Sequence, residues 1–76
     1  MGENNGDQEG NDMLRDEPLF KYFQFGHLPP NLQVFSAPWY NLAKSVILNI
    51  PRSAERTVAL RKLLEGKDCA VRAMLP

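Results

Sequence analysis

Two arginines and two hydroxyl side chains lie within seven residues at the predicted start of a helix, in the segment PRSAERT at residues 51–57. The first amides of a helix have no partner inside the helix, and they carry the positive end of its dipole. Arginine binds phosphate oxygens through two parallel hydrogen bonds. Arg56 and Thr57 are therefore candidate phosphate ligands. An ordinary capped helix with solvated arginines is the alternative that the sequence leaves open.

A glycine and a lysine interrupt the apolar stripe of the same predicted helix. Lys67 falls near the centre of the stripe at about 100° per residue, and Gly66 beside it costs roughly 1 kcal/mol relative to alanine in a helix interior. The pair indicates a close approach by another backbone or by an anionic ligand, which makes Lys67 a candidate ligand-binding residue. The alternative is a lysine that extends its charge from the edge of a short core.

Two further sets of side chains are candidates for ligand contact. Arg72 is followed by Ala73, and the small side chains of Ala70 and Ala73 allow a flat ligand or a neighbouring backbone to approach. Tyr22 and His27 belong to an aromatic segment and have polar tips, and tyrosine can stack on a nucleobase. Their alternatives are a structural core role and, for Arg72, a solvated face with i,i+4 ion pairs. The residues of that face are Arg61, Glu65, Asp68 and Arg72.

The remaining chemistry is sparse. The sequence has one histidine and one cysteine, and it contains no Walker loop, no GxGxxG motif and no cluster with metal-ligand spacing. These residues and the few acids of the predicted folded part are a poor set for catalysis. We therefore expect a binding protein and not an enzyme, with no catalytic residue, no metal and no cofactor.

Residues 51–75 predict the helix that positions most of these candidates. Ser53 is a natural N-cap, and Glu55 places a negative charge at the positive end of the dipole. Apolar residues then recur at helical spacing along one stripe. They are Leu60, Leu63, Leu64, Val71 and Met74.

A second helix is predicted to start at Pro29–Pro30, because proline is tolerated in a first turn, and to end near Asn49. One apolar face passes straight through Pro38, which predicts a single helix kinked at this proline. Two shorter helices, the second of them capped by Ser36, are the alternative. The face consists of Leu32, Phe35, Trp39, Leu42, Ala43, Val46 and Ile50.

Residues 50–53 separate the two helices, since the residue before a proline avoids helical geometry. So short a connection makes the helices antiparallel neighbours. The predicted fold is all-α, an antiparallel helical hairpin with a short aromatic N-terminal arm or helix over residues 18–28. Two helices cannot cover both apolar faces, so we expect a compact homo-oligomer. Leu48, on the opposite side of its helix, and Tyr40 are candidates for the subunit interface.

Charge divides the chain into an acidic and a basic part. Residues 1–18 hold six acids and one base, and residues 19–76 hold eight bases and three acids. Residues 1–17 predict a disordered acidic tail and residues 18–76 a single helical domain, whose basic surface favours an anionic partner. There is no run of about 18 apolar residues, no secretory leader and no second cysteine, so we expect a reducing cytoplasm and no membrane partner.

Three segments together resemble a family of small phage proteins, the anti-CBASS cyclic-nucleotide sponges, which are related to the Thoeris-inhibiting sponges. The segments are FKYFQFGHLPPNLQ at residues 20–33, a Pro-aromatic-x-x-Leu-Ala pattern at residues 38–43, and ERTVALRKLLEGKDCAVRA at residues 55–73. The resemblance covers about residues 20–75 and is carried mainly by ERTVALRKLLE and KDCAVRA. Gly66, where the family is expected to have alanine, departs from the pattern.

The resemblance implies an all-helical protomer that assembles into a homohexamer in the host bacterial cytoplasm. It implies capture of cyclic dinucleotides in pockets shared between protomers, and of cyclic trinucleotides at separate sites, without cleavage. Capture starves bacterial immune effectors of their second messenger. By this resemblance Tyr22 stacks a base, Arg56 and Thr57 hold phosphate, and Arg72 with Ala73 forms the second ligand site.

Two other functions fit the same sequence. A nucleic-acid-binding module would use the basic helix face and would bind with a steep dependence on salt. A protein-interaction inhibitor of a host enzyme would dock through an exposed apolar face. Bases alternate with acids along the helix predicted over residues 51–75, and no recognition-helix pattern is present, so we expect no DNA partner.

Overall fold

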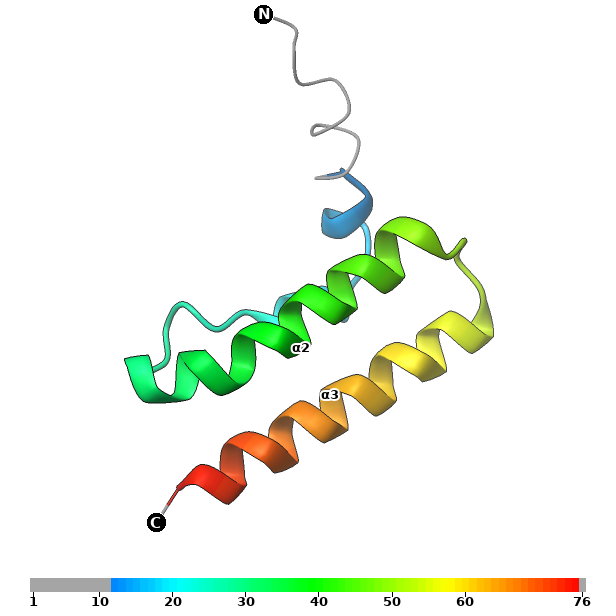
Figure 1. Cartoon of the computed structure of the whole chain (residues 1–76). Helices are drawn as coiled ribbons and strands as arrows, with labels where there is room; N and C mark the ends of the chain where they lie inside the picture. Colours follow the sequence, from blue (N-terminus) through cyan, green and yellow to red (C-terminus); the bar gives the residue numbers. More distant parts are fainter. Residues whose placement is uncertain (1–11, 76) are drawn as a thin grey trace, which may run out of the picture.

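The computed structural model describes residues 12–75, in which every regular element is helical (Figure 1). One helical turn at residues 12–15 precedes the 3-10 helix η1 (Phe20–Phe23) and the long helices α2 (Pro30–Asn49) and α3 (Ala54–Met74). The helices α2 and α3 lie side by side, and the chain reverses its direction between them at residues 50–53. The prediction of an all-α fold is thereby confirmed for the described residues.

The start of α3 follows from its capping residue. Ser53 has an extended backbone, and its hydroxyl oxygen accepts a hydrogen bond from the amide of Arg56 at 3.0 Å. The carbonyl of Ser53 accepts from the amide of Thr57 at 3.1 Å, which closes the first turn. Glu55 lies in that turn, where its charge complements the helix dipole. The predicted helix start is confirmed.

Helix α2 runs without interruption through Pro38. It begins after Pro29, which serves as its N-cap, and the second proline, Pro30, occupies the first helical position where no amide is needed. The side chain of Pro38 is exposed. The alternative of two separate helices is therefore wrong, since one helix covers residues 30–49.

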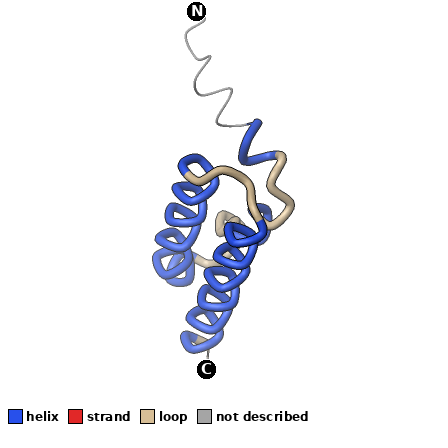
Figure 2. The backbone as a smooth tube through the Cα atoms, turned by 90° about the vertical axis from the view of Figure 1, so that its right-hand side faces the viewer, coloured by secondary structure: helices blue, strands red, loops and turns tan. Residues whose placement is uncertain are grey.

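The core is small and is shared by η1, α2 and α3. Phe23, Ile47 and Leu60 are fully buried, and Phe20 and Ala43 pack with them. Figure 2 shows the two long helices from the side, with the segment before α2 completing the fold beside them. The aromatic arm predicted from the sequence therefore contributes a substantial part of the core.

Tilted and edge-to-face contacts between aromatic rings fix the arm against α2. The ring of Tyr40 lies 4.9 Å from that of Phe20 and 5.3 Å from that of Phe25, measured between centroids. Aromatic pairs at such distances add roughly 0.5–1.5 kcal/mol to their burial. The side chain of Gln33 also donates to the carbonyl of Leu28 at 2.7 Å, which holds the chain just before α2.

The buried face of α2 differs from the predicted one. Leu32, Ser36, Ala43 and Ile47 are buried, whereas three members of the predicted face are about half exposed. Those three are Phe35 (45%), Leu42 (49%) and Ile50 (46%). The predicted apolar face is rotated about the helix axis relative to the face that is buried. The reason is that the arm packs on one flank of α2 and buries side chains on that flank.

Leu48 and Tyr40 have partners within their own chain. Both are partly buried and pack against the core cluster. Met13 and Leu48 line the same pocket, and Tyr40 contacts the arm rings. Both residues thus have contacts within the chain, and their place in a subunit interface stays a prediction.

The boundary of the predicted tail is also corrected. Residues 12–15 form a helical turn, Leu14 is 9% exposed and Glu17 is 6% exposed. The folded part thus begins by residue 12, because Leu14 contributes an apolar side chain to the core and Glu17 forms a buried ion pair with Arg56. The rest of the predicted tail, residues 1–11, lies outside the described residues.

Within residues 12–75 we find no helix that has both the length and the apolar character required to cross a bilayer.

Candidate functional site

The first turns of α3 bring cationic and hydroxyl side chains to a pocket of about 310 Å³. We call it the entrance pocket. Thr57 and Arg61 reach it from α3 at i,i+4 spacing, and Arg52 reaches it from the connection before the helix. The opposite wall is formed by residues 17–19. From here on, the arm means residues 16–28, which precede α2. The lining residues are Glu17, Pro18, Leu19, Arg52, Thr57 and Arg61.

The hydroxyl group of Thr57 is within reach of a ligand but is already engaged. It donates to the carbonyl of Ser53 at 3.2 Å. Thr57 is half-buried. An anion in the entrance pocket would therefore compete with a backbone carbonyl for this proton.

Arg56, the predicted phosphate ligand beside it, points into the protein. Its guanidinium donates to the carbonyls of Ile50 at 2.8 Å and Ile47 at 3.2 Å. It also donates to the carboxylate of Glu17 at 2.8 Å, in an ion pair whose two side chains are each 5% exposed. Arg56 thus satisfies the final carbonyls of α2, which lack helical partners, and fastens the arm.

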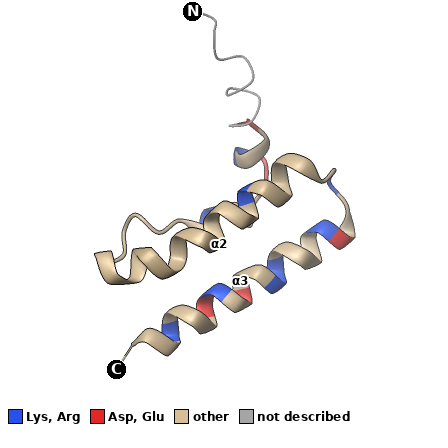
Figure 3. Ribbon diagram, viewed as in Figure 1, with Lys and Arg blue, Asp and Glu red and all other residues tan. Residues whose placement is uncertain are grey.

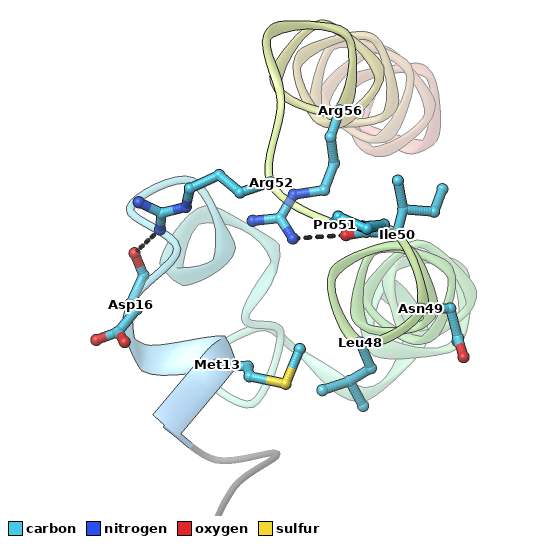
Figure 4. Close-up of a pocket in the computed structure, with 8 residues that line it drawn as sticks. All are labelled: Met13, Asp16, Leu48, Asn49, Ile50, Pro51, Arg52 and Arg56. Atoms are coloured by element: carbon cyan, nitrogen blue, oxygen red, sulfur yellow. Dashed lines mark hydrogen bonds between the residues drawn. The ribbon is translucent and has the colours of Figure 1, made fainter.

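A larger pocket of about 570 Å³ lies on the other side of this arginine. We call it the loop pocket. Figure 4 shows the side chains of Arg52 and Arg56 extending into it from the same end of α3. Arg52 donates to the backbone carbonyl of Asp16, so its contact with the arm leaves its charge without a carboxylate partner. The lining residues are Met13, Asp16, Leu48, Asn49, Ile50, Pro51, Arg52 and Arg56.

The charges on α3 are distributed differently from the prediction. Glu65 pairs with Lys62 at 3.8 Å instead of with Arg61, and Asp68 pairs with Lys67 at 3.5 Å instead of with Arg72. The predicted i,i+4 ion pairs are therefore wrong. Among residues 12–75, neither Arg52 nor Arg61 forms an ion pair. Figure 3 shows how closely the basic and acidic positions alternate along this helix.

Lys67 is held by the arm of its own chain. Its ammonium donates to the backbone carbonyl of Tyr22, and its side chain is only 11% exposed. Within the chain, the group that approaches Gly66 is the indole ring of Trp39. A Cβ atom on Gly66 would lie 3.0 Å from two carbons of that ring. Both unusual residues of the stripe therefore have an internal explanation.

The other predicted ligand residues are exposed and lie apart. Tyr22 is 52% exposed, and His27 is exposed in the turn before α2. Arg72 and Ala73 are exposed near the end of α3, where the guanidinium of Arg72 donates to the sulfur of Cys69 at 3.4 Å.

One chain does not gather these residues into one site. Eleven residues separate Arg56 from Lys67, or about 16 Å along an α-helix at 1.5 Å per residue. Tyr22 lies at the Lys67 position, and Arg72 lies farther along α3. The structure brings together Arg52, Thr57 and Arg61, and it places Lys67 with Tyr22, and Arg72 with Ala73, at two other levels of α3.

Two residues of the site are missed by the sequence patterns. Glu17 is assigned to the tail, and Arg61 is treated as part of a solvated face. A signal for the internal role of Arg56 is nevertheless present in the spacing. Arg56 lies four residues before Leu60, and Lys67 lies seven residues after Leu60, so all three share one face of the helix.

The arrangement is suited to holding an anion. Two guanidinium groups, which have no acidic partner among residues 12–75, and a hydroxyl side chain line one pocket near the start of α3, together with the carboxylate-bearing Glu17, which is paired with Arg56. Among the described residues, no group of three or more His, Cys, Asp or Glu side chains is arranged to hold a metal ion.

In comparisons with known proteins, no family model matches the chain, and neither a curated protein nor a solved structure is similar to it.

Proposed function

We propose that this protein binds and sequesters cyclic oligonucleotide second messengers without cleaving them. Cyclic dinucleotides are the first ligand class and cyclic trinucleotides the second. The setting is the host bacterial cytoplasm, where a phage anti-defence protein would remove the messenger of an immune system such as CBASS. The protomer is a helical hairpin, and the working assembly is a homohexamer. The support comes from the sequence resemblance together with the geometry of the entrance pocket.

The observation that carries the proposal is the convergence of Arg52, Thr57 and Arg61 on the entrance pocket. A cyclic dinucleotide has two phosphodiester groups, each with one negative charge. Guanidinium groups bind such oxygens in pairs of hydrogen bonds, and a helix start adds the favourable end of a dipole. Neither arginine would have to leave an ion partner among the described residues in order to bind.

The proposal changes the role of one predicted ligand. Arg56 is buried against Glu17, so we assign it to positioning the arm, which forms the far wall of the entrance pocket. Phosphate contact is assigned to Arg52 and Arg61, with Thr57 as a further donor. These assignments apply to the first ligand class.

A second copy of the chain is part of the proposal. A volume of about 310 Å³ is at the lower end of the roughly 300–1,000 Å³ typical of small-molecule sites. A neighbouring protomer would enlarge the site and supply a stacking ring. Tyr22 and His27 remain the proposed base contacts for that role, Lys67 stays a prediction, and Arg72 with Ala73 remains proposed for the trinucleotide.

The test is a calorimetric titration with a panel of cyclic di- and trinucleotides, followed by recovery of the bound ligand. We expect tight binding and chemically intact ligand on release. Replacement of Arg61 by alanine should weaken dinucleotide binding by ten- to a hundredfold, because a charge-assisted hydrogen bond contributes roughly 1.5–3 kcal/mol. Thr57→Val should weaken it less, since its hydroxyl is shared with Ser53.

Lys62→Ala is the matched control. Lys62 is the next residue along α3, carries the same charge and has a side chain 73% exposed. Its removal should leave the affinity unchanged. Equal losses for Arg61→Ala and Lys62→Ala would show that only net charge matters, and failure of every cyclic oligonucleotide to bind would refute the proposed function.

A further inference from the structure

The loop pocket lies where α2 ends and α3 begins, and the proposed function makes no use of it. Its volume of about 570 Å³ lies within the roughly 300–1,000 Å³ typical of small-molecule sites. The helical turn at residues 12–15 contributes Met13, which lies across the pocket from the end of α2 (Figure 4). Segments that are far apart in the sequence thus enclose one concave site.

Four apolar side chains line the loop pocket. They are Met13, Leu48, Ile50 and Pro51. Met13 is 44% exposed and Ile50 is 46% exposed, although both are large apolar side chains. Covering them with an apolar group would be favourable, because it removes their surface from water. The pocket is therefore suited to a ligand with an apolar body.

One positive charge in the pocket wall has no acidic partner. Arg52 is exposed, donates to the backbone carbonyl of Asp16 and forms no ion pair among residues 12–75. Figure 4 shows the carboxylate of Asp16 turned away from this guanidinium. The other charge in the wall, that of Arg56, is compensated by Glu17. Arg52 thus provides the positive charge that an anionic head group can bind.

A second observation points to an acceptor on the ligand. The side chain of Arg56 is 5% exposed, and its Nε atom has no hydrogen-bond acceptor among residues 12–75. A buried donor without an acceptor is unfavourable and is rare in native proteins. Because Arg56 lines the loop pocket, an oxygen atom at the inner end of the pocket would supply this acceptor. The atom is covered, so the contact requires a small shift of the wall, for which the unbranched side chain of Met13 is suited.

We infer that the loop pocket binds a small monocarboxylate with an apolar body, of the medium-chain fatty acid type. The carboxylate accepts from the guanidinium of Arg52 and from the Nε–H group of Arg56. The apolar body lies against Met13, Leu48 and Ile50. A cation would be repelled by Arg52, and a polyphosphate would bring several charges to one available guanidinium and leave the apolar wall uncovered. This site goes beyond the proposed function, and it can be tested in the absence of any nucleotide.

The experiment is a calorimetric titration of the full chain with octanoate. Three comparison ligands separate the parts of the molecule: acetate has the head alone, 1-octanol has the body with a neutral head, and octylammonium has the body with the opposite charge. We expect octanoate to bind at one site per chain, at least tenfold more tightly than each of the three. Absence of octanoate binding would overturn the inference, as would equal affinity for octanoate and octylammonium.

Variants assign the binding to the loop pocket. Arg52→Gln should weaken octanoate binding at least tenfold, whereas Lys62→Gln, which removes an exposed charge of α3, should leave it unchanged. Arg52 also lines the entrance pocket, so the deciding variant is Ile50→Ser, which should weaken binding at least fivefold. Val58→Ser is its matched control, because Val58 is also 46% exposed but does not line the loop pocket. Equal losses in the two serine variants would overturn the inference, and circular dichroism establishes that each variant remains helical.

Nuclear magnetic resonance tests the contacts directly. Saturation with octanoate should move the Nε–H proton resonance of Arg56 downfield, because this proton gains an acceptor. The methyl resonance of Met13 should also shift, while that of Met74, which is 41% exposed at the far end of α3, should not. An unchanged Arg56 resonance would overturn its assignment as a donor, and equal shifts of the two methyl groups would overturn the assignment of the pocket.

This inference and the proposed function can fail separately. Octanoate binding that depends on Ile50 would stand even if no cyclic oligonucleotide bound to the protein. Nucleotide binding that depends on Arg61 would likewise stand if octanoate did not bind.

Discussion

The guanidinium of Arg56 and the carboxylate of Glu17 form an ion pair of 2.8 Å across 39 residues of sequence, with both side chains 5% exposed. The same guanidinium binds two carbonyls at the end of α2. One side chain therefore joins the arm, α2 and α3. Removing either charge leaves the other buried without an oppositely charged partner.

Glu17→Gln should lower the free energy of unfolding by about 3–5 kcal/mol, because an uncompensated buried charge is costly. Urea denaturation followed by circular dichroism measures this loss. Asp12→Asn is the control, since Asp12 pairs with Arg15 on the surface with side chains 59% and 71% exposed, and such pairs contribute only about 0–1 kcal/mol. If Glu17→Gln were no more destabilising than Asp12→Asn, the structural role of the pair would be disproved.

The double variant Glu17→Leu with Arg56→Met should be more stable than Arg56→Met alone, because no charge is then left buried. It should not reach the wild type, since the carbonyls of Ile47 and Ile50 lose their donor. A double-mutant cycle should yield a coupling energy above about 1 kcal/mol. Additive losses would mean that the two side chains act independently.

Lys67→Met should loosen the arm while leaving α2 and α3 helical. The variant removes the donor to the carbonyl of Tyr22 but keeps the apolar stem, and a hydrogen bond from a charged group contributes roughly 1.5–3 kcal/mol. Amide hydrogen exchange should show faster exchange at residues 20–24 than in the wild type. Lys62→Met, at an exposed position of the same helix, serves for comparison, and equal exchange in the two variants would rule out the anchoring role.

Gly66→Val should destabilise the protein by roughly 1–3 kcal/mol through overpacking. Even the first added carbon would lie 3.0 Å from the ring of Trp39. Ala73→Val places the same side chain at an exposed position of α3 and should cost only about 0.5 kcal/mol of helix propensity. Thermal unfolding distinguishes the two. Similar melting temperatures would show that the ring of Trp39 moves aside freely.

Ser53→Ala should lower stability by about 0.5–2 kcal/mol, and Ser53→Asp should retain most of it, because either oxygen can accept the amide of Arg56. Chemical denaturation of both variants measures the difference. Ser45→Ala, at an exposed position inside α2, is the control and should be nearly neutral. If the cap contributed nothing to stability, Ser53→Ala, Ser53→Asp and Ser45→Ala would all have the same free energy of unfolding.

Local patterns in the sequence were sufficient for the helical elements. The cap at Ser53 and the break at Pro51 depend on hydrogen bonds and steric limits within a few residues, so they can be read directly from the order of side chains. The spacing of Leu60 and Lys67 likewise placed the lysine on the buried face. The sequence also predicted that residues 51–57 could bind phosphate, because their arginines and hydroxyl groups are close together along the chain. It did not predict which of these side chains line the entrance pocket.

The sequence by itself thus determined where the long helices begin and end and that Lys67 lies on the apolar stripe of the helix after Ser53. Only the tertiary structure decided that Glu17 meets Arg56, that Tyr22 meets Lys67, and that Tyr40 on α2 is covered by the arm while Phe35 and Leu42 stay exposed. The physical reason is that helical periodicity records which residues share a face, whereas the partner of that face is selected by packing among segments far apart in the chain.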